Sequence, residues 1–158
     1  MKHLILIRHA ETAEKVTGQT DKDRELTTSG IRQAASAGAF LREQSVQIDM
    51  ILSSPASRAE TTSQLIAEQM GSTDLVTVED ELYQASVGTL FQIIRNADAH
   101  QNIAIVGHNP TISYFSEFIT GSIVEELRPG TAIIFKVPIG NWKDLTKGCA
   151  TVLDRFDA

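Results

Sequence analysis

Arginine and histidine side chains stand at three places in the sequence where a short apolar run ends. Arg8 and His9 follow the run LILI, Arg58 comes soon after MILSS, and His108 directly follows IAIVG. Arginine offers a planar fork of donors that fits the oxygens of a phosphoryl group. One imidazole can attack phosphorus and form a phosphohistidine, and a second can stabilise the phosphoryl oxygens. These residue types favour phosphoryl transfer with cations supplied by the chain, so no metal or other cofactor is expected.

The elements that would position these residues are short strands alternating with helices, a pattern typical of an α/β domain. Strands are predicted over residues 3–7, 49–54, 75–78 and 102–108, and the first is apolar on both faces, like a buried parallel strand. Residues 131–137 and 150–156, with a turn at PIGNW, predict an antiparallel hairpin at the edge of the sheet. The expected fold is a three-layer sandwich with a mostly parallel central sheet flanked by helices.

Four helices are predicted between the strands. The first covers residues 26–43, is capped by Thr27 or Thr28, and has an apolar face made of Ile31, Ala34, Ala35, Gly38 and Leu41. The second has Pro55 in its first turn, and the third contains residues 87–94. The fourth is capped by Asn109 and opened by Pro110.

The candidate residues all follow predicted strands. In an open, mostly parallel sheet, ligands bind in the crevice outside the carboxyl ends of the strands. Arg8 and His9 follow the first predicted strand, Arg58 follows the second, and His108 follows the fourth. We therefore expect residues about 50 and about 100 positions apart to meet at one edge of the sheet.

The composition is that of one globular domain, and we expect residues 1–158 to form a single domain. Of the 158 residues, 42% are hydrophobic and 22% are charged. A formal charge of −6 does not favour a nucleic-acid-binding surface. No apolar run has the length of a membrane span or a signal-peptide core, and the single cysteine, Cys149, fits a reducing compartment. The expected location is the cytoplasm, with no membrane partner; the oligomeric state stays open.

Four segments, LIRHAE, LTTSG, SSPASRAETT and VGHNP, occur in this order. They resemble the histidine phosphatase superfamily, and the short chain is most similar to its SixA-like phosphohistidine phosphatases, over residues 3 to about 137. The resemblance implies a phosphoglycerate mutase-like fold, with His9 as the nucleophile and Arg8, Arg58 and His108 as the phosphate pocket. It places Arg24 near the substrate entrance. The implied substrate is a protein phosphohistidine or a small phosphorylated molecule.

Larger members of the superfamily carry a glutamate as proton donor in a Leu-x-Glu run. The matching stretch here, ELYQAS, places Gln84 at that position, and an amide cannot donate a proton as an acid does. Phosphoglycerate mutase activity is therefore not expected, although Glu11 or Glu81 are alternative acids. Two other functions stay open, namely a general phosphomonoesterase and a module that binds phosphorylated partners without turnover.

Two further patterns are interpreted as structural. Cys149 to Arg155 has the C-x5-R spacing of cysteine-dependent phosphatases, but its β-branched interior predicts a strand rather than a phosphate-binding loop. The aspartates of DKD, residues 21–23, resemble those of metal-dependent phosphatases, yet no strand precedes them. The surrounding TDKDRE is a charged loop, and for Arg24 plain solvation is the alternative to a role in substrate binding.

Overall fold

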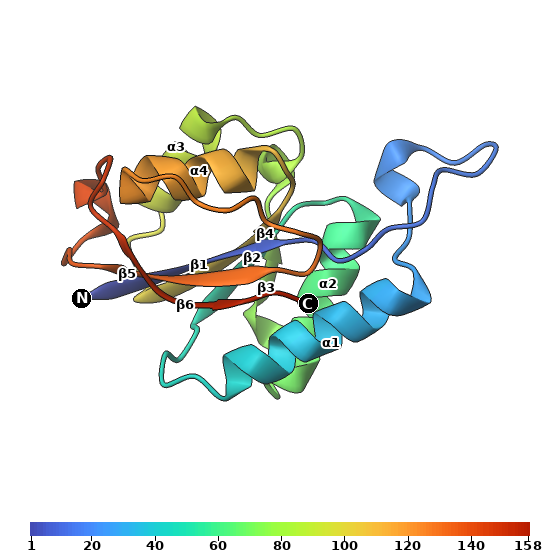
Figure 1. The fold of residues 1–158 in the computed structure, drawn as a ribbon, viewed down its shortest axis with the longest axis horizontal. Helices are drawn as coiled ribbons and strands as arrows, with labels where there is room; N and C mark the ends of the chain where they lie inside the picture. Colours follow the sequence, from blue (N-terminus) through green and yellow to red (C-terminus); the bar gives the residue numbers. More distant parts are fainter.

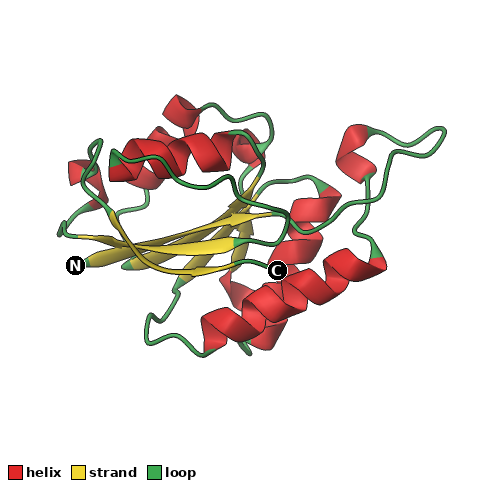
Figure 2. Cartoon of the chain, viewed as in Figure 1, coloured by secondary structure: helices red, strands yellow, loops and turns green.

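A six-stranded sheet crosses the middle of the molecule, with helices on both of its faces (Figure 1, Figure 2). The computed structural model describes all residues, 1–158. The strands are β1 Lys2–Arg8, β2 Met50–Ser53, β3 Val76–Val78, β4 Asn102–Gly107, β5 Ala132–Val137 and β6 Thr151–Phe156, in the order β3-β2-β4-β1-β5-β6. The first four are parallel, β5 is antiparallel to β1, and β6 is antiparallel to β5. The predicted three-layer α/β fold with an antiparallel C-terminal pair of strands is confirmed.

The two outer layers are pairs of helices. Helices α1, Thr28–Arg42, and α2, Ser57–Gln69, cover one face, and α3, Val87–Arg95, and α4, Thr111–Thr120, cover the other (Figure 1). Strand β1 alternates between the two cores: Leu4 and Leu6 pack on the α3–α4 side, and Ile5 and Ile7 on the α1–α2 side. All four side chains are fully buried, which confirms the prediction of a strand covered on both faces.

The start of α1 explains the LTTSG segment. Thr27 is the N-cap, and its side chain accepts a hydrogen bond from the backbone N–H of Gly30. A Cβ on Gly30 would lie 2.1 Å from the carbonyl oxygen of Glu11, so only glycine allows the helix to approach this loop. The prediction that Ile31 faces the core is wrong, because its side chain is 46% exposed. Contact with α2 instead turns Gly30, Ala34, Ala37, Gly38 and Leu41 inward.

Two helix starts differ from the sequence prediction. Helix α2 begins at Ser57 with Ala56 as its N-cap, so Pro55 lies before the helix and not in its first turn. The hydroxyl of Ser54 accepts from the N–H of Ala56, which holds this segment as a turn of its own. In α4 the N-cap is Pro110. Asn109 does not cap it, because its side chain donates to the carbonyl of Leu127 and accepts from the hydroxyl of Ser113.

The strands predicted at residues 131–137 and 150–156 are confirmed as β5 and β6 to within one residue, and the bend predicted at PIGNW begins a long connection between them. This connection covers residues 138–150 and includes the short 3-10 helix Trp142–Asp144. Trp142 is fully buried in the core on the α3–α4 side, and its indole N–H donates to the carbonyl of His100 at 2.8 Å. Burying this large side chain needs more chain than a tight turn provides.

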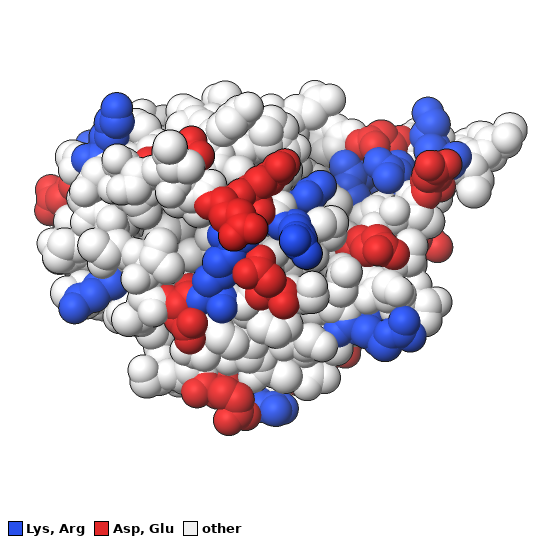
Figure 3. Space-filling model, in the orientation of Figure 1, with Lys and Arg blue, Asp and Glu red and all other residues white.

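One segment, here called the β1–α1 arm (residues 12–27), extends beyond the three layers (Figure 1). Its two ends are joined by an antiparallel bridge between Thr12 and Leu26, and a 3-10 helix, Asp21–Asp23, lies within it. Lys and Arg alternate with Asp and Glu on the face shown in Figure 3 and form no single basic area there. None of the helices combines the length and apolar character that crossing a membrane requires.

Candidate functional site

A cavity of about 470 Å³ lies at the carboxyl ends of β1, β2 and β4. All five residues predicted from the sequence line it: Arg8, His9, Arg24, Arg58 and His108. Arg8 is the last residue of β1 and His9 follows it, Arg58 lies in the first turn of α2, His108 follows β4, and Arg24 lies on the β1–α1 arm. The expected convergence at this edge of the sheet therefore occurs.

His9 has a defined tautomer. Its Nδ1 lies 2.9 Å from the backbone oxygen of Ala10, with the hydroxyl of Thr12 at 3.3 Å. Because a carbonyl oxygen can only accept, Nδ1 must carry the proton, and Nε2 keeps its lone pair. Burial, with smaller contributions from the nearby His108, Arg58 and Arg8, lowers the pKa of His9 to about 3 against the opposing effect of the Ala10 carbonyl. At neutral pH, His9 is thus a neutral imidazole with one free nitrogen.

His108 is the second imidazole of the cavity. Its ring centroid lies 5.2 Å from that of His9, and its Nε2 lies 2.7 Å from the hydroxyl oxygen of Ser54. Burial, followed by the charge of Arg58, lowers the pKa of His108 to about 4. The two histidines therefore face one another uncharged, and the positive charge of the cavity comes from arginines.

Arg8 and Arg58 are held in different ways. Arg8 donates to the carbonyl of Leu127 at 3.0 Å, and its buried Nε has no protein partner. Burial lowers the pKa of Arg8, although the charge of Glu126 opposes this. Arg58 is only 7% exposed and donates through both terminal nitrogens to Asp21. Its ion pair with the carboxylate measures 3.1 Å.

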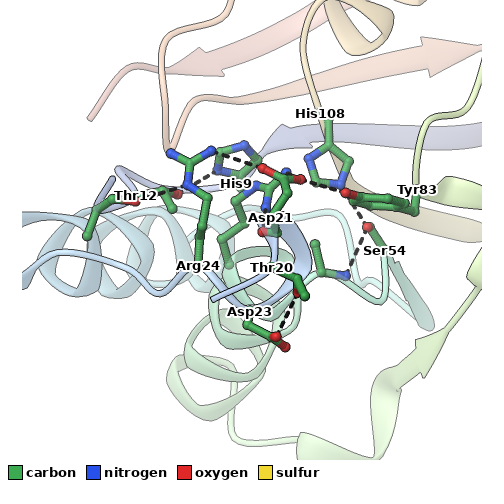
Figure 4. A network of polar contacts seen from close by, with 12 residues as sticks. His9, Thr12, Thr20, Asp21, Asp23, Arg24, Ser54, Tyr83 and His108 are labelled. Carbon is green, nitrogen blue, oxygen red and sulfur yellow. Dashed lines mark hydrogen bonds and ion pairs between the residues drawn. The ribbon is translucent and has the colours of Figure 1, made fainter. Parts of the chain in front are cut away.

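The β1–α1 arm places Asp21 in the cavity, which the sequence interpretation missed. Its carboxylate accepts from Arg24 at 3.2 Å and from the hydroxyl of Tyr83 at 2.6 Å (Figure 4). It also accepts from Arg58 at 3.1 Å. Plain solvation, the alternative considered for TDKDRE, therefore does not account for these contacts of Asp21 and Arg24. Lys22 also contacts this group, with its ammonium 4.8 Å from the centre of the Tyr83 ring. The one sequence signal was the three-residue spacing of Asp21 and Arg24.

Tyr83 was also missed, although it directly precedes Gln84. Both residues line the cavity and follow a 3-10 helix, Asp80–Leu82. The backbone of Gln84 has a φ of 58°, a left-handed conformation uncommon for residues other than glycine. Of the two alternative acids, Glu11 lines the cavity and accepts from the hydroxyl of Thr27, whereas Glu81 lines a separate pocket.

The segment from Cys149 to Arg155 is not a phosphate-binding loop. Residues Thr151–Phe156 form strand β6, as the sequence predicts, and Arg155 pairs with Asp157 at 2.9 Å. The structure contains no group of three or more His, Cys, Asp or Glu side chains that could hold a metal ion.

Residues 4–93 match the family model of the histidine phosphatase superfamily (branch 1). The chain belongs to this superfamily. The Mycobacterium tuberculosis protein Rv1276c is 32% identical over 93% of this chain and 96% of its own length. A structure described as a candidate phosphohistidine phosphatase SixA from Nakamurella multipartitia has a TM-score of 0.83 and 26% identity, and covers 98% of this chain and 95% of its own.

A third match is the structure of the protein histidine phosphatase SixA complexed with tungstate. It has a TM-score of 0.83 and covers 98% of this chain and 96% of its own, with 19% identity, so that this match bears on the fold alone. Together the comparisons confirm the SixA-like resemblance and the phosphoglycerate mutase-like fold, and they identify the chain as a phosphatase. The family model ends before His108, whose place in the site rests on the geometry.

Proposed function

We propose that this phosphatase works through a covalent phosphohistidine on Nε2 of His9. The observation that carries the proposal is the hydrogen bond between Nδ1 of His9 and the backbone oxygen of Ala10. It leaves a neutral imidazole with a free lone pair among three arginines, which is the arrangement that a nucleophile attacking a phosphoryl dianion needs. Arg8, Arg58 and His108 are proposed to bind the phosphoryl oxygens, and Arg24 to hold the rest of the substrate.

The reaction proceeds in two displacements. In the first, the lone pair of Nε2 forms a bond to phosphorus while the bond to the leaving group breaks on the opposite side, and the leaving group keeps that electron pair. In the second, water attacks the same phosphorus, His9 departs as a neutral imidazole, and the proton of water passes to solvent or phosphate. The negative charge on the phosphoryl oxygens is stabilised by the guanidinium groups, so neither step requires a metal ion.

The favoured substrate class is phosphohistidine, in a protein or in a small molecule. Gln84 stands where larger family members have an acid, and an alcohol oxygen leaves poorly without a proton. Imidazole leaves more readily, because its second nitrogen can hold a proton near neutral pH. The SixA structures that resemble this chain are described as phosphohistidine phosphatases, which supports the same class. The alternative is a general phosphomonoesterase. Glu11 lines the cavity and would favour this alternative if it protonated the leaving alcohol.

The test is to trap and map the phosphoryl group. The protein is mixed with 32P-labelled phosphoramidate, quenched rapidly in alkali, digested and mapped. We expect label on the peptide that contains His9, none in His9→Ala, and undiminished label in His100→Gln. His100 is a suitable control because it precedes β4, at the end of the strand opposite to His108.

Three results would contradict the proposal. Turnover by His9→Ala within tenfold of the wild type would exclude His9 as the nucleophile. Turnover without any trapped label would point to direct attack by water. Binding of phosphoramidate without turnover would favour the phosphate-recognising module instead.

A further inference from the structure

We propose that Asp21 recognises the leaving imidazole of a phosphohistidine substrate, by accepting a hydrogen bond from the ring N–H that is not bonded to phosphorus. The inference rests on the proposed function of His9 and adds to it a group that selects the substrate. Asp21 comes from the β1–α1 arm, an element separate from the strand ends that supply His9, Arg8 and His108.

The position of Asp21 suits a leaving group. Its side chain is 47% exposed, whereas that of its partner Arg58 is 9% exposed. Asp21 therefore lies at the mouth of the cavity, above the buried guanidinium. Because attack on phosphorus occurs in line, a leaving group opposite Nε2 of His9 is directed away from the strand ends and toward solvent. A substrate ring held by a phosphoryl group at Arg58 would then lie next to this carboxylate.

The carboxylate is fixed in place and still has room for one more donor. Tyr83, Arg58 and Arg24 each donate one hydrogen bond to it, and Figure 4 shows Arg24 and Tyr83 on either side of the carboxylate. A carboxylate offers about four acceptor sites, so about one is left. The three contacts order the side chain before substrate binds, which reduces the entropy lost on binding.

Asp21 is also chemically suited to an imidazole rather than to an alcohol. The hydrogen bond from Tyr83, together with those from Arg58 and Arg24, holds the pKa of Asp21 well below its usual range. An acid this strong stays ionised and cannot protonate a departing alkoxide. It can stabilise a phosphorylated imidazole that is protonated on its other nitrogen, because that ring is a cation.

The transfer step then balances without an acid catalyst. The substrate enters with its phosphorylated ring protonated on the other nitrogen, and Asp21 accepts a hydrogen bond from that N–H. Nε2 of His9 bonds to phosphorus, the P–N bond of the substrate breaks, and its electron pair returns to the ring nitrogen. The product is a neutral imidazole that keeps its N–H on Asp21. No proton moves during the displacement, so Gln84 is sufficient at the position of the family glutamate.

The charged and titratable groups around Asp21 determine how this contact depends on pH. Arg58, Arg24 and Tyr83 touch Asp21, and Lys22 lies over the Tyr83 ring. The hydrogen bond to Asp21 raises the pKa of Tyr83, so its hydroxyl stays protonated at neutral pH.

The remaining titratable and charged groups of the cavity are Arg8, Glu11, His9 and His108. The pKa of His9 is about 3 and that of His108 about 4. A loss of rate on the alkaline side of neutrality therefore reports the substrate ring and not these histidines.

The experiment compares phosphoimidazole with p-nitrophenyl phosphate in wild type, Asp21→Asn and Asp23→Asn. Asp23 is the matched control because it lies in the same 3-10 helix but accepts from Thr20 and does not line the cavity. We expect Asp21→Asn to lower the ratio of kcat/KM for phosphoimidazole to that for p-nitrophenyl phosphate by about tenfold. Asp23→Asn should leave this ratio unchanged.

The pH profile separates recognition from mere positioning of Arg58. A nearby carboxylate favours the protonated ring of the substrate. Asp21→Asn should therefore lower, by about one pH unit, the pH at which kcat/KM for phosphoimidazole falls on the alkaline side (the alkaline limb). The alkaline limb for p-nitrophenyl phosphate should stay in place. Asp21→Glu should restore the limb, and Tyr83→Phe, which keeps the carboxylate, should retain it.

Equal losses on both substrates with an unmoved limb would overturn the inference, because they would mean that Asp21 only holds Arg58. If circular dichroism shows that Asp21→Asn is unfolded, the alkaline limbs of Tyr83→Phe and Asp21→Glu test the inference instead. A limb for phosphoimidazole that is lowered in both variants would then contradict it. The proposed function is tested separately by label on His9 in the wild type. If label forms and the ratio does not change, only the role of Asp21 is wrong.

Discussion

The pH dependence of the nucleophile is the most direct consequence of how His9 is buried. An imidazole with the reference pKa of 6.5 would be about 3% neutral at pH 5, but with a pKa of about 3 it is about 99% neutral. With a pKa of about 4, His108 is also about 90% neutral there. We therefore expect kcat/KM at pH 5, corrected for substrate ionisation, to stay within about twofold of its value at pH 8 rather than fall about 30-fold.

The assay is kcat/KM for p-nitrophenyl phosphate between pH 4 and 8, with the ionisation of the substrate measured separately by 31P NMR. In parallel, NMR titration of the imidazole carbons follows His9 and His108 in the free enzyme. An acid limb with a midpoint near the reference pKa of 6.5, in both the kinetics and the His9 resonance, would refute the reasoning from burial.

The same shifts predict a direction for stability. Below the reference pKa of 6.5, the unfolded chain binds protons on these two histidines while the folded protein does not, down to about 4 for His108 and about 3 for His9. The free energy of unfolding therefore increases as the pH rises through this window and decreases on acidification. Urea unfolding at several pH values measures it, and a stability that increases toward acid would contradict the assignment of two buried neutral imidazoles.

Four further predictions follow from particular contacts. Arg58→Ala should lower kcat/KM by about 10²-fold or more, whereas Arg24→Ala, on the exposed arm, should mainly raise KM; equal effects in steady-state kinetics would contradict these roles. Gln84→Glu should narrow the difference in kcat/KM between aryl and alkyl phosphates of graded leaving-group pKa, and a flat series in the wild type would show that departure is already assisted. Gly30→Ala should lower the melting temperature and the activity, because its Cβ would meet the Glu11 carbonyl at 2.1 Å; an unchanged melting curve would argue against this contact. Cys149→Ser and added EDTA should both leave kcat/KM unchanged, and loss of activity that Mg²⁺ or Zn²⁺ restores would exclude a site that works without metal.

The sheet could be predicted from the sequence because its signal is local. Four residues, Leu4 to Ile7, are apolar without alternation, and a strand buried on both faces is the arrangement that satisfies all of them. The convergence of Arg8, His9, Arg58 and His108 then follows from the rule that parallel strands end at the same edge. These residues lie within a few positions of their strands, so small errors in strand boundaries do not displace them.

The details that failed depend on contacts between distant segments. Ile31 has the spacing of a core residue, but the packing of Gly38 against α2 sets the rotation of the helix and turns Ile31 outward. The bend at PIGNW could be predicted from the sequence, but the burial of Trp142 beside His100 could not. Asn109 is a favourable capping residue, yet Leu127 and Ser113, which are 18 and 4 residues away, use its side chain instead. Each outcome was decided by a partner that local sequence does not specify.

The position of Asp21 shows how far such reasoning can be extended once burial is known. Arg58 is almost fully buried, and a buried guanidinium with five donors needs acceptors, preferably a carboxylate. The sequence contains 20 acidic residues, but only those in segments at the carboxyl edge of the sheet can reach it. The β1–α1 arm starts at that edge and returns to α1, which packs on α2, the helix that carries Arg58. The acid is therefore expected on this arm, where Asp21 reaches Arg58 both with its carboxylate and with its main-chain oxygen, which accepts at 2.8 Å. A half-exposed carboxylate on a charged loop is thus held at the site by its buried partner.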